Sequence, residues 1–316
     1  MSEAVRIGTR GSALALWQAE HVAARLRSLP GSPPVELVTI QTEGDKIQDV
    51  PLSKLPGKAF FTKELEQAIL DGRTDLAVHS LKDVATSMPE GLTLGAILER
   101  EDPRDALVAR PGLALETLPE GARVGTSSLR RAAFLRRWRP DLEVLDLRGN
   151  VPTRLRRLDE GGYDAIVLAA AGLKRLGLEA RIIDYLPFHV LLPAVSQGAI
   201  AVQIRAADER IGPWVGRLNH EPTRLATAGE RSLLREVEGG CQVPLGAYGV
   251  VSDGRLEISA AMAALDGSIS VSGSIEGSAA DAVMLGRGLA SDLMARGGAA
   301  VMAGIRGVLD GGDRRA

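Results

Sequence analysis

Apolar residues near the start of the chain fall into short continuous runs, with a helix-spaced stretch between them. Three runs have the length and composition of strands: residues 5–8, 35–42 and 76–79. Between the first two, Leu14, Trp17 and Leu26 share one face of a predicted helix over residues 13–28. Ser12 precedes that helix, where a serine side chain can cap the first turn. Strands alternating with helices predict an α/β fold with mostly parallel sheets.

A long polar segment interrupts this alternation. Residues 43–59 are rich in Gly, Pro, Asp and Lys and predict a loop. Loops of this length in compact domains usually act as lids or binding loops. Thr62 follows the loop and is predicted to cap a helix that ends at Asp71.

Two motifs occur twice in the same order, which predicts two similar α/β halves. Residues 6–14 (RIGTRGSAL) and 123–131 (RVGTSSLRR) both give a strand, a Gly-Thr turn and the start of a helix. Residues 62–78 and 153–167 both give a helix, a glycine turn, an aspartate and an apolar strand. Chance similarity is the alternative, because each match is short and uses common residues. In sheets of this kind ligands bind at the carboxyl ends of the strands.

The last hundred residues have a different pattern. Residues 221–237 predict a helix with Pro222 near its start. Three short strands are predicted at 247–251, 256–265 and 269–275, and the dipeptides Asp253-Gly254 and Asp266-Gly267 are hairpin signals. Residues 281–296 and 299–309 predict two further helices. This part therefore reads as an α+β module with an antiparallel sheet.

Composition narrows the class of protein. A chain of 316 residues suggests two or three domains. The net charge of −2 and the aromatic content of 3% give no basic surface or stacking platform for nucleic acid. No apolar run approaches the ~20 residues that span a bilayer, and the first residues lack a signal pattern. One cysteine and four scattered histidines predict a reducing compartment, which we take as cytoplasmic, and no metal site.

Arginines are concentrated in one part of the chain. Of 38 basic residues six are lysines, which leaves 32 arginines, and ten of these lie between residues 121 and 157 against three acidic residues. A solvated helix face is sufficient reason for five of the ten: Arg136, Arg137, Arg139, Arg156 and Arg157. The others, apart from Arg123, stand where predicted strands end and helices begin, and so predict an anion-binding cleft.

Five positions carry that prediction. Arg130 and Arg131 follow the hydroxyl-rich turn at 126–128, and Arg148 follows the end of a strand. Arg154 falls on the first turn of the next helix, and Arg10 holds the matching place in the first half. Planar guanidinium groups match carboxylates in pairs. If the two halves face each other, these arginines converge on one site for a polycarboxylate.

Two further segments carry candidate chemistry. In residues 75–83 (DLAVHSLKD) a buried strand runs into a polar loop where Lys82 and Asp83 are adjacent, although a surface ion pair is the alternative. In residues 238–245 (EGGCQVPL) glycines and a proline place Cys241 in a loop between a helix and a strand. A free cysteine is commonly a buried small apolar residue, so that alternative stays open. No histidine is tied to Cys241, which disfavours a thiol hydrolase.

Taken together, the motifs resemble the hydroxymethylbilane synthase (porphobilinogen deaminase) family of tetrapyrrole biosynthesis. The resemblance covers nearly the whole chain and is weakest at the C-terminus. Seven blocks in the family's order carry it: 9–18 (TRGSALALWQ), 78–83 (VHSLKD), 101–105 (EDPRD), 124–131 (VGTSSLRR), 147–151 (LRGNV), 169–173 (AAAGL) and 238–244 (EGGCQVP).

The resemblance implies three domains. Residues 1–99 and 198–217 would form a discontinuous α/β lobe, residues 100–197 a second lobe, and residues 218–316 an α+β domain with a small antiparallel sheet that carries the cysteine. The two lobes would be built like periplasmic binding proteins. The activity implied is the deaminating condensation of four porphobilinogen molecules onto a dipyrromethane primer, with release of hydroxymethylbilane and ammonia. The partners implied are porphobilinogen and the growing polypyrrole chain, bound by a monomer.

The resemblance also implies roles for individual residues. Cys241 would hold the dipyrromethane through a thioether, and Asp83 would be the catalytic carboxylate that stabilises cationic pyrrole intermediates. The cofactor would be held by Ser80, Lys82, Asp83, Thr126, Ser128, Arg130, Arg131 and Arg148. The substrate would be held by Arg10, Ser12, Gln18, Lys58, Arg148, Arg154, Arg175 and Gln197. Each added unit brings two carboxylates, and a charge-assisted hydrogen bond to each contributes about 1.5–3 kcal/mol.

Three positions depart from the family pattern. Pro56 and Ala59 replace the outer glycines of a Gly-Gly-Lys-Gly motif before the first-lobe helix, and Ser196 replaces the first glycine of a Gly-Gln-Gly motif. None of the three carries the implied chemistry. A solute-binding protein with the same two-lobed fold remains an alternative for the arginine cleft, but it gives Cys241 and the third domain no purpose. The intact mass separates these possibilities, because only a synthase carries two extra pyrrole units.

Overall fold

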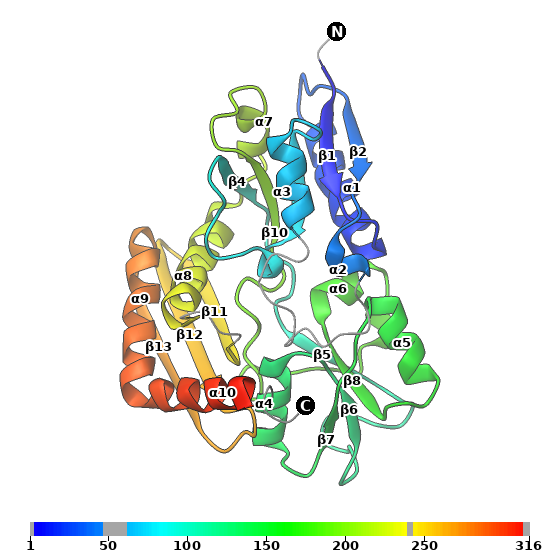
Figure 1. Cartoon of the computed structure of the whole chain (residues 1–316), viewed down its shortest axis with the longest axis vertical. Helices are drawn as coiled ribbons and strands as arrows, with labels where there is room; N and C mark the ends of the chain where they lie inside the picture. The colour runs from blue at the N-terminus through cyan, green and yellow to red at the C-terminus, as the bar shows by residue number, and fades with distance from the viewer. Residues whose placement is uncertain (1–2, 47–61, 239–242, 312–316) are drawn as a thin grey trace.

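The computed structural model describes residues 3–46, 62–238 and 243–311. Three β-sheets organise them: two of five strands and one of three strands. Figure 1 shows the first five-stranded sheet at the top, the second at the lower right and the three-stranded sheet at the lower left. We call these parts lobe 1, lobe 2 and the third unit.

Lobe 1 contains the predicted strands of the first eighty residues and one strand from much later in the chain. Its strands lie in the order β2 (Val35–Thr39), β1 (Val5–Thr9), β3 (Leu76–Ser80), β10 (Ile200–Arg205) and β4 (Leu92–Ile97). Strands β2, β1 and β3 are parallel, and β10 runs antiparallel to both of its neighbours. The lobe's helices are α1 (Ala13–Arg27), α2 (Glu43–Lys46), α3 (Lys63–Leu70) and α7 (Gly212–Gly216).

Lobe 2 repeats this arrangement. Its strands lie in the order β7 (Glu143–Leu145), β6 (Arg123–Gly125), β8 (Ala165–Ala169), β5 (Asp105–Ala109) and β9 (Asp184–Tyr185). Here β5 is the strand antiparallel to both neighbours, as β10 is in lobe 1. The helices are α4 (Leu129–Trp138), α5 (Val151–Asp159) and α6 (Ala170–Arg175). The predicted internal repeat and the mostly parallel strand direction are therefore confirmed.

The repeat extends to single hydrogen bonds. The backbone N–H of Arg6 donates to the Asp75 carboxylate at 2.8 Å, and that of Arg123 donates to the Asp164 carboxylate at 2.7 Å. Both aspartates precede the central parallel strand of their sheet, so each ties the start of one strand to the start of its neighbour. The aspartates recognised in the sequence repeat thus do the same structural work in both lobes.

The chain crosses between the lobes twice. It passes from β4 to β5 and returns from β9 to β10, and the strand after each crossing is the reversed strand of its sheet. The two crossing segments are hydrogen-bonded to each other, because the Glu101 N–H donates to the Gly198 carbonyl at 3.2 Å and the Arg100 Nε donates to the Gln197 carbonyl at 2.8 Å. Gly198 has φ +93°, and a Cβ there would collide with the Glu101 backbone carbonyl. Only glycine fits this contact without strain.

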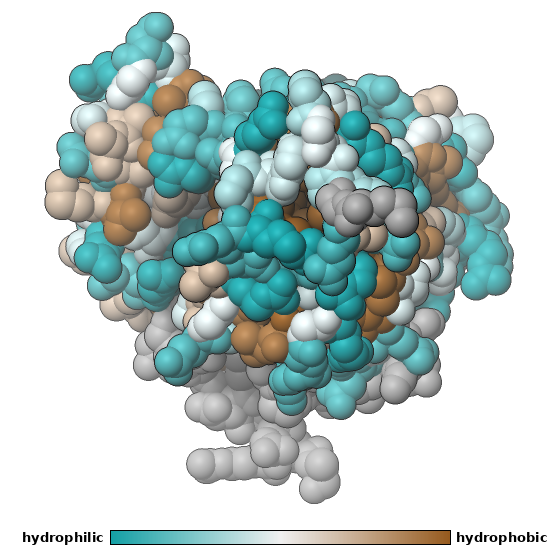
Figure 2. Space-filling view, turned by 90° about the horizontal axis from the view of Figure 1, so that it is seen from above, coloured by the Kyte–Doolittle hydropathy of each residue, from teal (hydrophilic) through white to brown (hydrophobic). Residues whose placement is uncertain are grey.

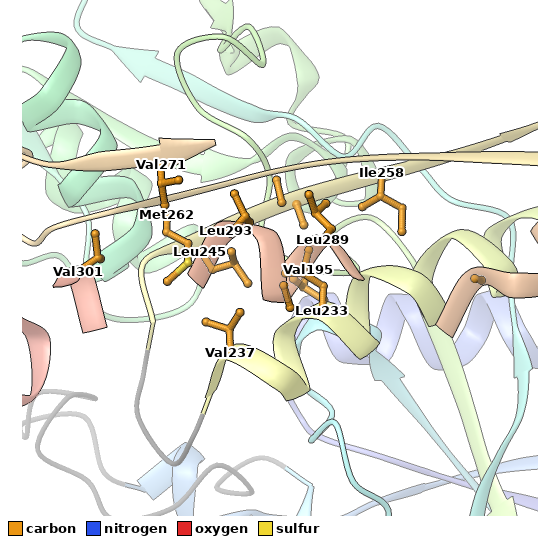
Figure 3. Packing of buried hydrophobic residues seen from close by; sticks show 14 of the residues in the cluster. Val195, Leu233, Val237, Leu245, Ile258, Met262, Val271, Leu289, Leu293 and Val301 are labelled. Carbon is orange, nitrogen blue, oxygen red and sulfur yellow. The ribbon is translucent and has the colours of Figure 1, made fainter. Parts of the chain in front are cut away.

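The third unit packs helices on one antiparallel sheet. Its strands β11 (Leu245–Ser252), β12 (Arg255–Ala263) and β13 (Ser270–Ser278) lie in sequence order, and its helices are α8 (Glu221–Glu238), α9 (Ala282–Leu293) and α10 (Ala299–Gly311). Figure 3 shows Leu233, Ile258, Met262 and Leu289 filling the layer between sheet and helices. The predicted hairpins are confirmed.

One buried carboxylate joins the third unit to both crossing segments. Glu230 of α8 is fully buried and pairs with Arg100, with 2.5 Å between Oε1 and Nη1. Its Oε2 accepts from the Ser196 N–H at 2.6 Å, and its Oε1 accepts from the Gly249 N–H of β11 at 2.8 Å. Ser196 has φ 65°, in the left-handed region that favours glycine. At Ser196, therefore, the chain departs from the family pattern where the backbone conformation favours glycine.

Most helix ends agree with the sequence, with one exception. Ser12 caps α1 by accepting from the Ala15 N–H, as predicted. Thr62 occupies the cap position of α3, but its side chain makes no capping hydrogen bond, so that part of the prediction is wrong. The long loop predicted at 43–59 begins with α2, and residues 47–59 lie outside the described residues.

The surface is consistent with the balanced composition. The face seen from above in Figure 2 is mostly hydrophilic, with hydrophobic side chains in separate groups. None of the described helices combines the length and the apolar character that crossing a bilayer requires.

Candidate active site

A cavity of about 370 Å³ lies where the two lobes meet. It is lined by residues at or after the carboxyl ends of β1, β2, β3, β6, β7 and β8, together with Gly198 and Ala199 of the return crossing. In open α/β sheets the loops at these strand ends form the binding crevice, because helix N-termini and free backbone groups meet there. The predicted convergence of the two halves on one cleft is what the structure shows.

Lobe 1 contributes one wall. Arg10 and Ser12 follow β1, Ser80 ends β3, and Lys82 and Asp83 follow it. Lys82 and Asp83 lie in a 3₁₀ turn, Leu81–Asp83, whose Leu81 side chain is fully buried in the lobe's core. That burial leaves the two charged side chains exposed to the cavity.

Lobe 2 contributes the opposite wall with four arginines. Arg131 lies in the first turn of α4, Arg148 follows β7, Arg154 lies in the first half of α5 and Arg175 ends α6. Arg154 is oriented by its Nε, which donates to the Gly149 carbonyl at 2.7 Å. These four positions were all predicted as site residues from the sequence.

Arg175 also joins the lobes. Its Nη2 donates to the Gly198 carbonyl at 2.6 Å, and its guanidinium lies 5.7 Å from the centre of the Trp17 ring of α1. A cation this close to an indole face is attracted to it. Arg175 therefore helps to set the width of the cavity as well as its charge.

Asp105 is a buried carboxylate that the sequence reasoning did not assign to the site. It begins β5 and has no exposed surface. The Arg131 Nη2 lies 2.7 Å from its Oδ1, and the Arg130 Nη1 lies 2.7 Å from its Oδ2. Burial by itself would raise the pKa of Asp105, but the two guanidinium groups outweigh burial and hold that pKa below its ordinary value. In the sequence, only its position in the family motif at residues 101–105 could have indicated that Asp105 belongs to the site.

The two predicted glutamines are placed differently. Gln18 is buried in α1 and lines a recess of about 70 Å³ beside the main cavity, where its Nε2 donates to the Ser80 hydroxyl at 2.8 Å. Gln197 is buried on the return crossing, and its Oε1 accepts from the Lys82 Nζ at 3.2 Å. Both contact a cavity residue rather than line the main cavity.

Besides Gln197, three predicted residues are not among those lining either space. Thr126 is buried and its hydroxyl accepts from the Ser128 N–H, while Ser128 caps α4 by accepting from the Arg131 N–H. Arg130 points inward, where its Nη1 donates to the Leu192 carbonyl at 2.6 Å. Lys58 and Cys241 lie outside the described residues.

Two arginines assigned to a solvated face have structural partners. Arg139 is half-buried, and its Nε donates to the Asp141 carboxylate at 2.7 Å. The Arg136 Nη1 donates to the Leu265 carbonyl at 2.8 Å, a contact between α4 and the third unit. Arg137, Arg156 and Arg157 are exposed, as predicted.

The surroundings of the cavity disfavour the charged forms of several of its basic side chains. Desolvation lowers the pKa of Lys82 to about 8, against smaller opposing effects of Asp83 and Asp105. Desolvation likewise lowers the pKa of Arg154 and of Arg175 to about 10. Lys82 is exposed to the cavity, where water screens its charge and weakens this effect. Cations destabilised in this way are stabilised by any anion that enters.

A buried donor points to the same ligand chemistry. Nη1 of Arg148 is buried and has no hydrogen-bond partner among the described residues. Buried guanidinium nitrogens are costly when unpaired, and a carboxylate is their usual planar partner. The cavity is therefore built for a ligand with several carboxylates.

Comparison with solved structures finds similarity to extracellular and periplasmic binding proteins. A methionine-binding protein, MetQ, matches 68% of this chain and 89% of its own, with a TM-score of 0.45 and 14% identity. An amino-acid ABC transporter extracellular-binding protein from Bacillus subtilis matches 69% and 90%, with a TM-score of 0.40 and 12% identity. At these TM-scores the likeness adds nothing to the assignment of function.

Sequence comparison is far more specific. Residues 5–212 match the family model "porphobilinogen deaminase, dipyromethane cofactor binding domain", and residues 225–295 match "porphobilinogen deaminase, C-terminal domain". The porphobilinogen deaminase of Syntrophomonas wolfei is 50% identical over 302 residues, which is 96% of this chain and 99% of the relative. That of Moorella thermoacetica is 50% identical over 302 residues and 96% of each chain.

The residues present fit the cofactor of this family. A dipyrromethane carries several carboxylates, and the cavity offers the unpaired Arg148 nitrogen and the desolvated cations Lys82, Arg154 and Arg175. The cofactor is attached covalently to Cys241, the only cysteine of the chain. The chain belongs to the porphobilinogen deaminase (hydroxymethylbilane synthase) family of transferases, which condense four porphobilinogen molecules into hydroxymethylbilane with loss of ammonia.

Proposed function

We propose that the cavity between the lobes is the place of this reaction and that Asp83 is its catalytic carboxylate. The dipyrromethane on Cys241 would supply the nucleophilic pyrrole carbon that begins the chain. The remaining work falls to side chains of the two lobes. One observation carries the proposal: Asp83 is the only carboxylate among the described residues that line the main cavity, and it faces four arginines of lobe 2.

The cations hold the ligand's acidic groups. Arg131, Arg148 and Arg154 stand on lobe 2, and Arg10 and Ser12 stand on lobe 1, so a ligand bound between them is gripped from both sides. Guanidinium groups favour carboxylates because each can donate two parallel hydrogen bonds. Held in this way, the pyrrole rings would keep their nitrogens and aminomethyl carbons available to Asp83, the carboxylate of the cavity wall.

Asp83 would stabilise charge that develops during the reaction. When the substrate loses ammonia, positive charge spreads over the pyrrole that remains, and a carboxylate held nearby lowers the energy of that state. The turn Leu81–Asp83 is anchored by buried Leu81, so the carboxylate is in place before the charge appears. An interaction made only along the reaction path affects turnover more than binding.

The test compares Asp83→Asn with Asp83→Glu in holoenzyme whose primer is supplied as preformed product. We expect Asp83→Asn to lower kcat at least about 100-fold, since it keeps the size of the side chain and removes its charge. Asp83→Glu keeps the charge and should retain measurable turnover. Asp71→Asn, at an exposed position in lobe 1, is the matched control and should behave like wild type.

Mass spectrometry of the intact variants must accompany the kinetics. Each variant should carry the mass of two pyrrole units, which shows that the primer is present and that the defect lies in turnover. If Asp83→Asn with a full primer turns over like wild type, Asp83 is not the catalytic carboxylate.

The finer organisation is also part of the proposal. We place domain boundaries at 1–99 with 198–217, at 100–197 and at 218–316. In support, β4 ends at Ile97, β10 begins at Ile200 and α8 begins at Glu221. We further propose a cytoplasmic monomer without nucleic-acid or membrane partners, in keeping with the net charge of −2. Light scattering of the purified holoenzyme tests the monomer, since a dimer would double the mass.

A further inference from the structure

A chain of hydrogen bonds connects the two walls of the cavity behind its surface. The Lys82 Nζ of lobe 1 donates to the Gln197 Oε1 at 3.2 Å. The Gln197 Nε2 donates to the Asp105 Oδ1 at 3.0 Å, and the same oxygen accepts from the Arg131 Nη2 at 2.7 Å. Lobe 1, the return crossing and lobe 2 each contribute a member.

The orientation of the Gln197 amide is determined by its partners. Its Nε2 donates to the Pro103 carbonyl at 2.8 Å as well as to Asp105, and both partners can only accept. Its oxygen faces the Lys82 ammonium, which can only donate. A reversed amide would place donor against donor and acceptor against acceptor. Gln197 is therefore a connector with a defined direction.

Asp105 is the carboxylate in this series of hydrogen bonds. It is fully buried, and it is shared by Arg130, Arg131 and Gln197. Without it, Arg131 and Lys82 would face each other as like charges at the back of the cavity. A negative charge between them offsets much of that repulsion, because it attracts both cations.

We propose that Asp105 is a positioning residue for this active site: acting through Gln197, it sets the place of the Lys82 ammonium of lobe 1 relative to the Arg131 guanidinium of lobe 2. Its importance for turnover rests on the function proposed above. Its action on Lys82 does not, because that action is a property of the folded protein and can be measured without substrate.

The experiment measures the reactivity of Lys82 in holoenzyme. Trace acetylation with acetic anhydride at pH 7 is followed by mass spectrometry, and the labelling of Lys82 is divided by that of exposed Lys63 in the same molecule. Two variants interrupt the hydrogen bonds between Lys82 and Arg131 at different points: Asp105→Asn and Gln197→Met. Glu101→Gln is the control, because Glu101 is a carboxylate of the same crossing that accepts from the Lys174 Nζ at 3.1 Å, away from Lys82.

We expect both variants to raise the labelling ratio at least about threefold, since each removes a group that favours the charged, unreactive form of Lys82. Glu101→Gln should leave the ratio unchanged. Both lysines are already exposed, so a general loosening of the structure would not raise the labelling of Lys82 over that of Lys63.

The outcomes are decisive in either direction. An unchanged ratio in Gln197→Met overturns the proposal, even if Asp105→Asn changes it, because Asp105 would then act on Lys82 without the connector. If Asp105→Asn does not fold, Gln197→Met decides alone. Failure of the proposed function would appear separately, as Asp83→Asn holoenzyme that turns over like wild type while the labelling ratios behave as expected.

Discussion

Ser196 offers a test of how backbone strain and burial combine at the crossing between the lobes. It has φ 65°, no exposed surface, and a hydroxyl with no hydrogen-bond partner among the described residues. Its N–H donates to Glu230, an interaction that any residue except proline can make. Replacing Ser196 with glycine should therefore remove two unfavourable features and keep the favourable one.

The size of the effect follows from four contributions. A side chain in the left-handed region costs about 1–2 kcal/mol, and a buried hydroxyl without a partner costs about 1–3 kcal/mol. Against these, glycine loses about 0.5–1 kcal/mol of additional backbone entropy on folding, and removal of one buried carbon forfeits about 0.8 kcal/mol. The central expectation is that Ser196→Gly raises the free energy of unfolding by about 1–2 kcal/mol.

Equilibrium urea denaturation, followed by tryptophan fluorescence, measures this change. With a slope of about 3 kcal/mol/M, the midpoint should rise by about 0.3–0.7 M. Gly198→Ser is the reciprocal control two residues away. It should destabilise, because its Cβ would collide with the Glu101 carbonyl at φ +93°. A lower midpoint for Ser196→Gly would refute the reasoning and show that the serine hydroxyl is bonded after all.

Three further predictions concern the cavity and its surroundings. Arg148→Ala should lower kcat/KM at least about 10-fold, because it removes one charge-assisted hydrogen bond to the ligand. Arg157→Ala, at an exposed position, should leave kcat/KM unchanged in the same steady-state assay. Equal behaviour of the two variants would contradict the cavity assignment. Cys241→Ser should fold but lack the mass of two pyrroles, and an unmodified thiol in active wild-type enzyme would rule out the attachment. His79 is buried and its Nε2 lies 3.0 Å from the Gln203 Oε1; burial lowers its pKa to about 4. Because the unfolded chain binds that proton first, wild type should lose about 3 kcal/mol more than His79→Gln in urea denaturation as the pH falls from about 6.5 to 4, and parallel curves would refute the shift.

Local structure was largely available from the sequence. The repeat of Arg6 with Asp75 and of Arg123 with Asp164 predicted two like lobes, and both pairs form equivalent hydrogen bonds. Ser12 was predicted to cap α1 and does so. Such features depend on residues close in the chain or on the periodicity of burial, which sequence patterns express directly. Thr62 shows the limit, since its capping bond is absent although the residue type allows it.

The chemical character of the cavity could also be predicted from the sequence. Clustered arginines at predicted strand ends indicated a polycarboxylate site, and the cavity is lined by Arg10, Arg131, Arg148 and Arg154. In parallel sheets the strand ends meet at one edge whatever the exact packing, so residue type and place along the chain were sufficient for this conclusion.

Which neighbours share a site was decided only by tertiary structure. Arg130 and Arg131 are adjacent in the sequence, but successive side chains on a helix point about 100° apart. Arg131 therefore reaches the cavity while Arg130 points inward to the Leu192 carbonyl. The bond between Asp105 and Gln197 joins residues 92 positions apart, across the two lobe crossings. No local pattern encodes such a contact, because it exists only when both crossing segments have packed side by side.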